Sequence, residues 1–399
     1  MTVPATPPSP PSASPAPSPS SRSSSRSSTL SSTPTSTTLD EIVARRSIVV
    51  CCGSGGVGKT TIAAVVALEG ARLGRKTVVV TIDPAKRLAD ALGLAGLSDT
   101  PSRIDGDWPG ELWATMLDTK STFDALVAKY AATPDQGERI LANRFYRNIS
   151  GALSGTQEYM AMEKLYELHD ETDFDLVVVD TPPTRHALDF LDAPRRLSRF
   201  LEHRLFRMLM APSRGLARAV NVAAQTFLRT VSKVVGGDVV DDAMAFFQAF
   251  EGMEEGFRQR AARVTELIGA PETAFLLVAS PRRDTVEEAH FFADRLGQAG
   301  IAVEGLVVNR MHPSFGDGLG GLGEAAAERS RTLDGTDLGG LYRNLADFQT
   351  VASRERAHLA GLAETVAPAP VVWVPFLSSD VHDIAGVAAV AQHLFAREG

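Results

Sequence analysis

The feature that most constrains this chain is a glycine-rich turn between an apolar run and a helical pattern. Gly53, Gly58, Lys59 and Thr60 stand at the spacing G-x-x-x-x-G-K-[ST]. Glycines let backbone N–H groups surround phosphate oxygens, the lysine reaches the β- and γ-phosphates, and the threonine hydroxyl binds Mg²⁺. The apolar run Ile48–Cys52 precedes the turn, and an alanine-rich helical pattern follows it. The sequence therefore predicts a strand, a phosphate-binding loop, a helix and a nucleoside triphosphate site.

The whole loop is expected to contribute to this site. The residues concerned are Gly53, Ser54, Gly55, Gly56, Val57, Gly58, Lys59, Thr60 and Thr61. Lys59 is also a candidate catalytic residue, because its charge faces the phosphates that react. The alternative, a merely flexible glycine loop, does not account for the strand and helix that flank the motif.

Apolar runs recur along the chain, each followed by a turn and a helical pattern. The runs are Ile48–Cys52, Thr77–Ile82, Leu176–Val179, Ala274–Ala279, Val303–Val308 and Val371–Val374. Near-continuous apolar runs that alternate with helices are typical of a parallel sheet covered on both faces. We therefore predict an α/β, doubly wound P-loop NTPase fold with a mostly parallel sheet and an inserted α-helical subdomain.

Composition and strand signals divide the chain into segments. We expect a disordered Ser/Pro-rich tail (1–40), a first part of the core (41–118), a helical insert (119–171), a core strand with its switch (172–185), a second helical insert (186–270) and a C-terminal part of the core (271–399) with a Gly-rich loop (315–340). The tail has too few apolar residues to offset the entropy of ordering it.

Charge and cysteine content exclude several classes of function. The net charge of −8 argues against bulk nucleic-acid binding. No apolar run approaches the length of about 18 residues that a membrane span needs. The two cysteines, Cys51 and Cys52, are adjacent on a strand, so their side chains point to opposite faces. They indicate a reducing cytoplasm and cannot supply a four-cysteine metal site. We expect a cytoplasmic protein, either free or peripheral at a membrane.

Three further strand ends carry polar side chains suited to nucleotide chemistry. Asp180 ends an apolar strand and is expected, with Thr60, to hold Mg²⁺. Asp83 follows another strand and could orient or deprotonate an attacking water, although an Asp-Pro pair also marks ordinary turns. Asn309 has amide groups that could read adenine, although asparagine is common at strand ends.

Together these motifs resemble those of the ArsA-type ATPases, which include arsenite-efflux ATPases and the guided-entry ATPases that carry tail-anchored membrane proteins. The family's phosphate loop, its switch I, its switch II and its Val-Asn strand end match Gly53–Thr60, Asp83–Ala85, Asp180–His186 and Val308-Asn309. Ser154–Leu165 resembles the first helical insert of the family, and Val374–Phe376 resembles its adenine-side loop. The resemblance runs from residue 47 to about residue 398.

The resemblance implies roles for individual residues. Asp83 becomes the expected catalytic residue of an ATP hydrolase that uses Mg²⁺. Asn309, with Arg310 beside it and Pro375 on the adenine-side loop, becomes part of the expected nucleotide site.

Two positions depart from the family pattern. Where the family has a signature lysine that reaches the partner subunit's nucleotide, this chain has Ser54. A serine cannot supply that charge to the transition state, unless another basic residue substitutes. We therefore expect a heterodimer with a paralogous ArsA-type subunit that keeps the lysine, and slow turnover without it; a homodimer is the alternative. Arg185 stands where switch II has glycine, and it could either restrict the backbone or contact phosphate.

The second helical insert has an unusual charge. From Arg185 to Val235 there are ten Lys or Arg residues and three acidic residues, interleaved with apolar side chains such as Phe206, Met208 and Leu209. Such basic amphipathic helices suit a membrane surface or an apolar partner helix. An ordinary helical subdomain that packs its own apolar stripe is the alternative.

Four functions remain open from the sequence. The first is a nucleotide-driven targeting factor or chaperone with an apolar client or a membrane receptor. The second is a motor subunit of an oxyanion transport system, although no cysteine lies away from the phosphate loop. The third is a regulatory subunit that binds ATP and hardly hydrolyses it. The fourth is a positioning ATPase of the MinD type, which lacks large helical inserts.

Overall fold

The computed structural model describes residues 38–83, 86–149, 156–182, 189–202, 237–315 and 322–395. Its elements, in chain order, are α1 (Leu39–Arg45), β1 (Ile48–Gly53), α2 (Lys59–Arg72), β2 (Lys76–Thr81), α3 (Arg87–Ala91), β3 (Ser102–Ile104), β4 (Glu111–Met116), α4 (Thr119–Tyr130), α5 (Pro134–Ala142), α6 (Arg144–Ile149), α7 (Thr156–Asp170), β5 (Leu176–Asp180), α8 (Asp189–Glu202), α11 (Gly237–Ala249), α12 (Glu254–Gly269), β6 (Thr273–Ala279), α13 (Arg283–Gln298), β7 (Val303–Met311), α14 (Leu322–Thr332), α15 (Asp337–Val366), β8 (Val371–Pro375) and α16 (Ile384–Leu394). Among the described residues, no helix is both long and apolar enough to cross a bilayer.

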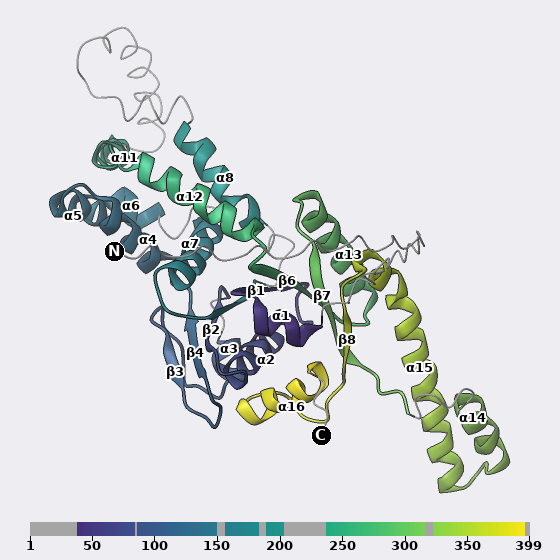
Figure 1. The fold of residues 1–399 in the computed structure, drawn as a ribbon. Helices are drawn as coiled ribbons and strands as arrows, with labels where there is room; N and C mark the ends of the chain where they lie inside the picture. The colour runs from purple at the N-terminus through teal and green to yellow at the C-terminus, as the bar shows by residue number, and fades with distance from the viewer. Residues whose placement is uncertain are drawn as a thin grey trace, which may run out of the picture. The chain divides into compact units, whose positions relative to one another are not determined.

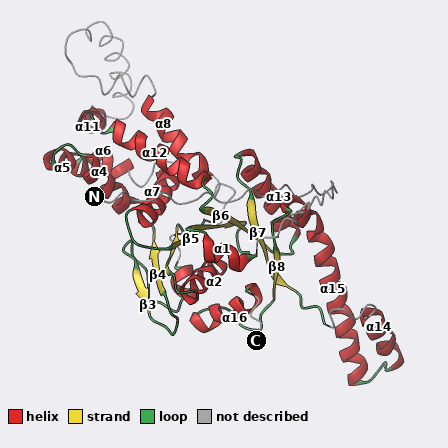
Figure 2. Ribbon diagram, in the orientation of Figure 1, coloured by secondary structure: helices red, strands yellow, loops and turns green. Residues whose placement is uncertain are grey.

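The strands form one eight-stranded sheet in the order β3-β4-β2-β5-β1-β6-β7-β8 (Figures 1 and 2). The pairings are parallel, except that β3 runs antiparallel to β4 at the sheet edge. The chain leaves β1 for β2 on one side and returns past β5 to β6 on the other, so β1 lies where the strand order reverses. This arrangement confirms the predicted doubly wound, mostly parallel fold.

Strand β1 is buried on both faces, which explains its continuous apolar sequence. Successive side chains of a strand point to opposite faces, so Val50 and Cys52 join one core layer and Val49 and Cys51 join the other. Helices α1, α2 and α16 cover one face, and α7, α12, α13 and α15 cover the other. The adjacent cysteines therefore lie in different layers, and both are buried as free thiols.

Two sequence-based expectations need correction: the strands at one edge of the sheet and the extent of the N-terminal tail. Strands β3 and β4 were not predicted, because β4 has no continuous apolar run and β3 is short and largely exposed. The expected tail (1–40) extends too far, because α1 begins at Leu39. Thr38 caps that helix by accepting from the Glu41 N–H, and Leu39 is buried in the core.

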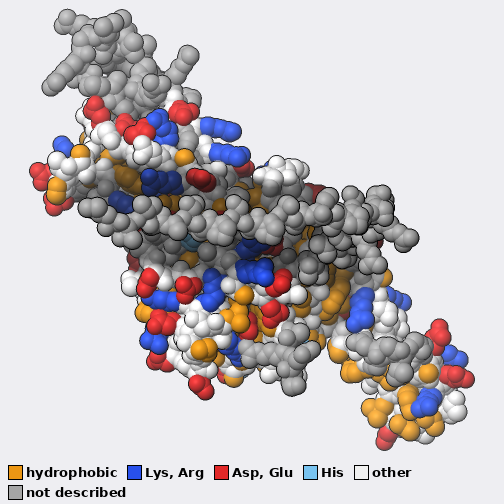
Figure 3. All heavy atoms as spheres, in the orientation of Figure 1, with side chains coloured by type: hydrophobic (Ala, Val, Ile, Leu, Met, Phe, Trp, Pro, Cys, Tyr) orange, Lys and Arg blue, Asp and Glu red, His pale blue; other side chains and the backbone are white. Residues whose placement is uncertain are grey.

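The expected Gly-rich loop (315–340) is wrong over most of its length. Residues 322–332 form α14, and α15 begins at Asp337, after Thr336 accepts a hydrogen bond from the Gly339 N–H. A Cβ on Gly339 would lie 2.2 Å from the Leu333 carbonyl oxygen. That glycine therefore serves close backbone packing and not flexibility. Figure 3 shows apolar side chains gathered on this helix pair, where Leu338 and Leu341 are 51% and 65% exposed.

The described part of the second helical insert is an internal core. Phe246 and Phe250 are buried on and just after α11, and they contact Tyr146 and Phe257 on neighbouring helices. This part of the insert therefore packs its own apolar stripe. The candidate groove residues Phe206, Met208 and Leu209 lie outside the described residues.

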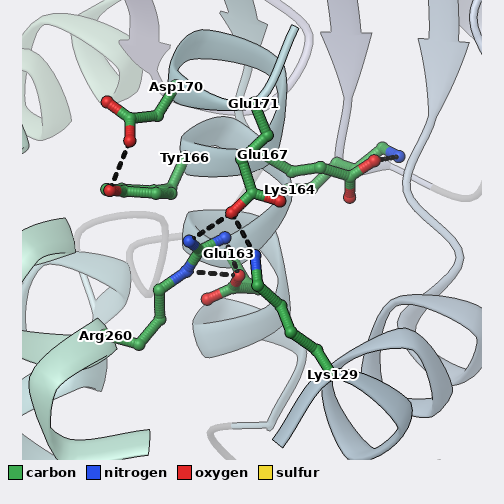
Figure 4. Close-up of polar contacts among 8 residues, drawn as sticks. All are labelled: Lys129, Glu163, Lys164, Tyr166, Glu167, Asp170, Glu171 and Arg260. Carbon is green, nitrogen blue, oxygen red and sulfur yellow. Dashed lines mark hydrogen bonds and ion pairs between the residues drawn. The ribbon is translucent and has the colours of Figure 1, made fainter. Parts of the chain in front are cut away.

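A buried ion-pair cluster joins three helices of the inserts (Figure 4). Arg260 on α12 is 4% exposed, and its Nε donates to Glu163 Oε1 on α7 at 2.6 Å. Its guanidinium also pairs with Glu171, which Lys129 of α4 contacts from the other side. The ring of Tyr166 lies 3.8 Å from the guanidinium carbon. Burial raises the pKa of Glu163, and the hydrogen bond from Arg260 opposes that rise. Ion pairs whose partners are partly or fully buried therefore connect helices α4, α7 and α12.

Candidate nucleotide-binding site

The sequence-predicted residues converge on one edge of the sheet. Strands β1, β2, β5, β7 and β8 are parallel, so their carboxyl ends lie together, which is where open α/β sheets bind ligands. Asp180 at the end of β5 pairs in register with Thr81 of β2 and with Cys51 of β1. The phosphate loop follows β1, Asp83 follows β2, Asp180 ends β5, and Asn309 lies near the end of β7.

The loop between β1 and α2 has the backbone that its glycines permit. Gly53 has φ +147°, and a Cβ there would lie 2.1 Å from the Val278 carbonyl oxygen. Gly58 has φ +95°, and a Cβ there would lie 2.2 Å from Asn309 Nδ2. Gly55 and Gly56 form the exposed tip of the loop, while Val57 is buried. Helix α2 then begins at Lys59 without a side-chain cap, so its first N–H groups face the loop, as phosphate binding requires.

Lys59 lies within the loop that it is expected to serve. Its Nζ donates to the Ser54 carbonyl oxygen at 2.7 Å, and the residue is 5% exposed. Burial lowers the pKa of Lys59, and the negative charge of Asp180 opposes that shift. A buried ammonium makes a stronger hydrogen bond to an anionic acceptor than to a neutral carbonyl oxygen. Phosphate oxygens would be such anionic acceptors for Lys59.

Asp180 is the best-defined acidic group of the site. Its Oδ2 accepts hydrogen bonds from Thr60 Oγ1 and Thr81 Oγ1, both at 2.9 Å. Its Oδ1 is buried and has no hydrogen-bond partner among the described residues. Burial raises the pKa of Asp180 to about 6, against the lowering effect of the two hydroxyl groups.

This donor set fits a Mg²⁺ ion bound together with nucleotide phosphates. Mg²⁺ prefers oxygen ligands and keeps several waters, with few ligands from the protein. The unpartnered Oδ1 of Asp180 and the adjacent Thr60 hydroxyl supply such oxygens. No cluster of three or more His, Cys, Asp or Glu suited to a metal occurs among the described residues, so phosphate and water would have to complete the ligand set.

Asp83 follows β2 and makes a contact that was not predicted. Its backbone N–H donates to Thr81 Oγ1 at 3.2 Å, so it is tied to the same threonine that contacts Asp180. Arg87, the first residue of α3, places a guanidinium nitrogen 3.2 Å from Asp83 Oδ2. The i,i+4 spacing was visible in the sequence, but Asp-Pro gave no sign that a helix would begin at Arg87. Pro84 and Ala85 lie outside the described residues.

Asn309 and Arg310 lie against the side of the phosphate loop that is opposite to Asp83. Asn309 Nδ2 donates to the Val57 carbonyl oxygen at 2.9 Å, and its Oδ1 accepts from the Arg310 N–H. Arg310 has φ +63°, and its guanidinium donates to the Gly56 carbonyl oxygen at 2.9 Å. Pro375 ends β8 next to Met311. The adenine-reading role of Asn309 stays a prediction, and its observed role is to brace the loop.

Ser54 occupies the position of the missing lysine. The residue is 2% exposed, and its buried Oγ has no hydrogen-bond partner among the described residues. Its side chain therefore points into the protein. Arg185 and His186 of the candidate switch II lie outside the described residues.

Comparisons of the sequence with known proteins point to one family. The sequence model of a family described as anion-transporting ATPase matches residues 46–317, which end before α14. The ATPase ASNA1 homolog of Dictyostelium discoideum is 27% identical over 264 residues, covering 65% of this chain and 70% of that protein. ATPase GET3 of Malassezia globosa is 25% identical over 277 residues, covering 69% and 76%. ATPase get3 of Neurospora crassa is 24% identical over 277 residues, with the same coverage. The chain belongs to the anion-transporting, or ArsA-type, ATPase family.

Proposed function

We propose that this chain binds Mg·ATP at the carboxyl edge of its sheet, hydrolyses it, and couples the nucleotide state to capture of an apolar or membrane-protein client. The observation that carries the proposal is the pairing of Thr60 with Asp180 at the start of α2. It leaves one buried carboxylate oxygen without a partner beside a hydroxyl that can bind a metal. Family membership supports nucleotide binding and hydrolysis in general.

Each residue of the site has a role in this proposal. Lys59 exchanges the Ser54 carbonyl oxygen for β- and γ-phosphate oxygens. Thr60 and Asp180 would hold the ion. Asp83 orients the attacking water or accepts its proton. Mg²⁺, when bound, neutralises charge that develops on the transferred phosphoryl group.

A contact between the site and the helical inserts supports the coupling step. Gln157 near the start of α7 donates to the Ile82 carbonyl oxygen at 3.4 Å, one residue before Asp83. Helix α7 packs in turn against α8 and α12, and Arg260 fixes α7 to α12 through Glu163. A shift of Asp83 on nucleotide binding would therefore reach the second insert through α7.

The client is proposed from sequence alone. The basic, apolar segment that contains Phe206, Met208 and Leu209 suits an apolar helix or an anionic membrane surface. The described part of the same insert has an internal core, which provides a rigid base for such a segment. A membrane receptor belongs to the same proposal, as does a cytoplasmic location with peripheral attachment.

A second candidate function is a motor or regulatory subunit of an anion transport system with weak intrinsic ATPase activity. The family description and the uncharged Ser54 favour it. Metalloid sensing by thiolates does not suit Cys51 and Cys52, because both are buried and burial raises the pKa of each thiol.

We also propose that the active form is a heterodimer with a paralogous ArsA-type subunit that has the signature lysine. The support is the small, buried, inward-pointing Ser54, which cannot reach a neighbouring subunit. A homodimer in which another basic residue supplies the charge is the alternative.

Two variants with a matched control test the hydrolase. Asp83→Asn keeps the side-chain shape and should bind Mg·ATP normally while turnover falls about 10²-fold or more, the usual scale for a positioned base. Lys59→Ala should weaken Mg·ATP binding itself. Asp90→Asn, an exposed aspartate on α3, serves as the control. Calorimetry measures the affinity for Mg·ATP, and phosphate release measures turnover. Both are measured on the purified chain alone and on the chain co-expressed with a paralogue. Unchanged affinity in Lys59→Ala would overturn the proposal.

A further inference from the structure

The ion pair between Arg87 and Asp83 lies at the reacting end of the proposed site. Asp83 is anchored: its backbone donates to Thr81, and its side chain is 13% exposed. Arg87 is much more exposed: its side chain is 57% exposed, and its guanidinium lies 3.2 Å from Asp83 Oδ2. A long, exposed side chain on a fixed carboxylate can change partners by rotating about its own bonds, without moving the backbone.

The same guanidinium also acts on the charge of Lys59 in the phosphate loop. The positive charge of Arg87 is among the groups that lower the pKa of Lys59, after burial, while Asp180 and Asp83 raise it. Arg87 and Lys59 are thus close enough to repel each other, and an anion between them would relieve that repulsion. Lys59 is the only charged residue in the loop from Gly53 to Thr60. Even with the Mg²⁺ that the site is proposed to hold, one ammonium from the loop leaves room for a second protein cation at the γ-phosphate, where charge changes during transfer.

We propose that Arg87 is a γ-phosphate-binding residue of this chain, held by Asp83 until the terminal phosphate takes over its guanidinium. The proposal rests on the proposed ATP site. On binding, the guanidinium exchanges a carboxylate for phosphate oxygens, to which it can donate two parallel hydrogen bonds. The exchange frees Asp83 Oδ2 for the attacking water in the same step. Asp83 is therefore unmasked by a nucleotide that has a γ-phosphate and stays paired with Arg87 when the nucleotide has none.

Among the described residues, Arg310 is another cation beside the loop, and it does not fit this role. Arg310 donates to the Gly56 carbonyl oxygen and follows Asn309, on the side of the loop opposite to Asp83. It is therefore placed on the β7 side, and Arg87 is on the side of the candidate catalytic carboxylate. Lys86 is adjacent to Arg87 and exposed, which makes it a matched control for the loss of one positive charge.

The test compares nucleotides that differ only in the γ-phosphate. Calorimetry on the full-length chain measures Mg·ADP and the non-hydrolysable Mg·AMP-PNP for the wild type, Arg87→Ala, Arg87→Lys and Lys86→Ala. Arg87→Ala should lose about tenfold or more in AMP-PNP affinity, the scale of a charge-assisted hydrogen bond, and keep its ADP affinity. Its ATP turnover should fall about 10²-fold, as when one transition-state donor is removed. Arg87→Lys should recover part of both losses, and Lys86→Ala should match the wild type.

Each other outcome has a definite meaning. Equal losses for ADP and AMP-PNP in Arg87→Ala would make Arg87 a structural residue and overturn the inference. Unchanged AMP-PNP affinity, or faster turnover in Arg87→Ala, would show that the arginine only restrains Asp83, and would also overturn it. A wild-type chain that binds neither nucleotide would instead refute the proposed function.

Discussion

Replacing Asp180 with asparagine should stabilise this protein in the absence of Mg²⁺, and the gain should depend on pH. Burial raises the pKa of Asp180 from 3.8 to about 6 in the folded chain. Between these two pH values, the folded protein therefore keeps a proton on Asp180 that the unfolded chain has already released. Because this shift is upward for an acid, the group costs stability at a pH above both pKa values, and the cost disappears as the pH falls towards the unfolded value.

The magnitude follows from the shift. A difference of about two units corresponds to about 3 kcal/mol near neutral pH, at 1.36 kcal/mol for each unit. About half of this penalty remains near pH 5, so the wild type should gain about 1 kcal/mol relative to the variant between pH 7 and pH 5. Asparagine keeps an oxygen acceptor for Thr60 and Thr81. Its NH₂ group then takes the place of the unpartnered Oδ1, at a cost of about 1–3 kcal/mol. This cost does not vary with pH, so the pH-dependent difference is the cleaner quantity.

Urea unfolding with EDTA, repeated near pH 5 and near pH 7, measures the two free energies of unfolding. Groups away from the site titrate equally in both proteins, so the difference between variant and wild type reports chiefly on Asp180. Added Mg·AMP-PNP should then stabilise the wild type and hardly affect Asp180→Asn. The same stability difference at both pH values would refute the buried-carboxylate reasoning, and a full Mg²⁺-dependent stabilisation of the variant would refute the metal role.

Three other perturbations have clear expectations. Arg260→Met should lower the free energy of unfolding by about 3–5 kcal/mol, because it leaves the buried Glu163 without its partner. In urea unfolding, the double variant Arg260→Met/Glu163→Leu should recover most of that loss. A double variant as unstable as the single one would contradict this expectation. Ser54→Lys should partly restore ATPase turnover of the isolated chain, although its long side chain must leave a buried position; lower thermal stability without any gain in rate would count against the missing-charge hypothesis. Polar substitution of Phe206, Met208 and Leu209 should leave ATP binding intact and abolish pull-down of an apolar helix, whereas a large loss of thermal stability would identify these residues as internal core.

The sequence alone identified the parts of the site that depend on neighbours along the chain. The spacing from Gly53 to Thr60 specifies a loop whose backbone is formed by its own residues. Asp180 follows a continuously apolar strand, and parallel strands bring their carboxyl ends to one edge, so its proximity to Thr60 followed from the fold class. β1, β2, β5 and β6 were recognisable because burial on both faces leaves a strong apolar signal, whereas β8 is apolar in sequence although only Val374 is fully buried.

Tertiary structure decided the features that depend on packing between distant or exposed residues. Arg260 and Glu163 are 97 positions apart, and nothing in either local sequence indicates the partner. The glycines near α14 suggested a loop, yet Gly339 lies in the first turn of α15, where the Leu333 carbonyl oxygen leaves no room for a Cβ. The pairing of Arg87 with Asp83 depends on where α3 begins. Local patterns report backbone preference and burial, whereas side-chain partners are chosen by the packed chain.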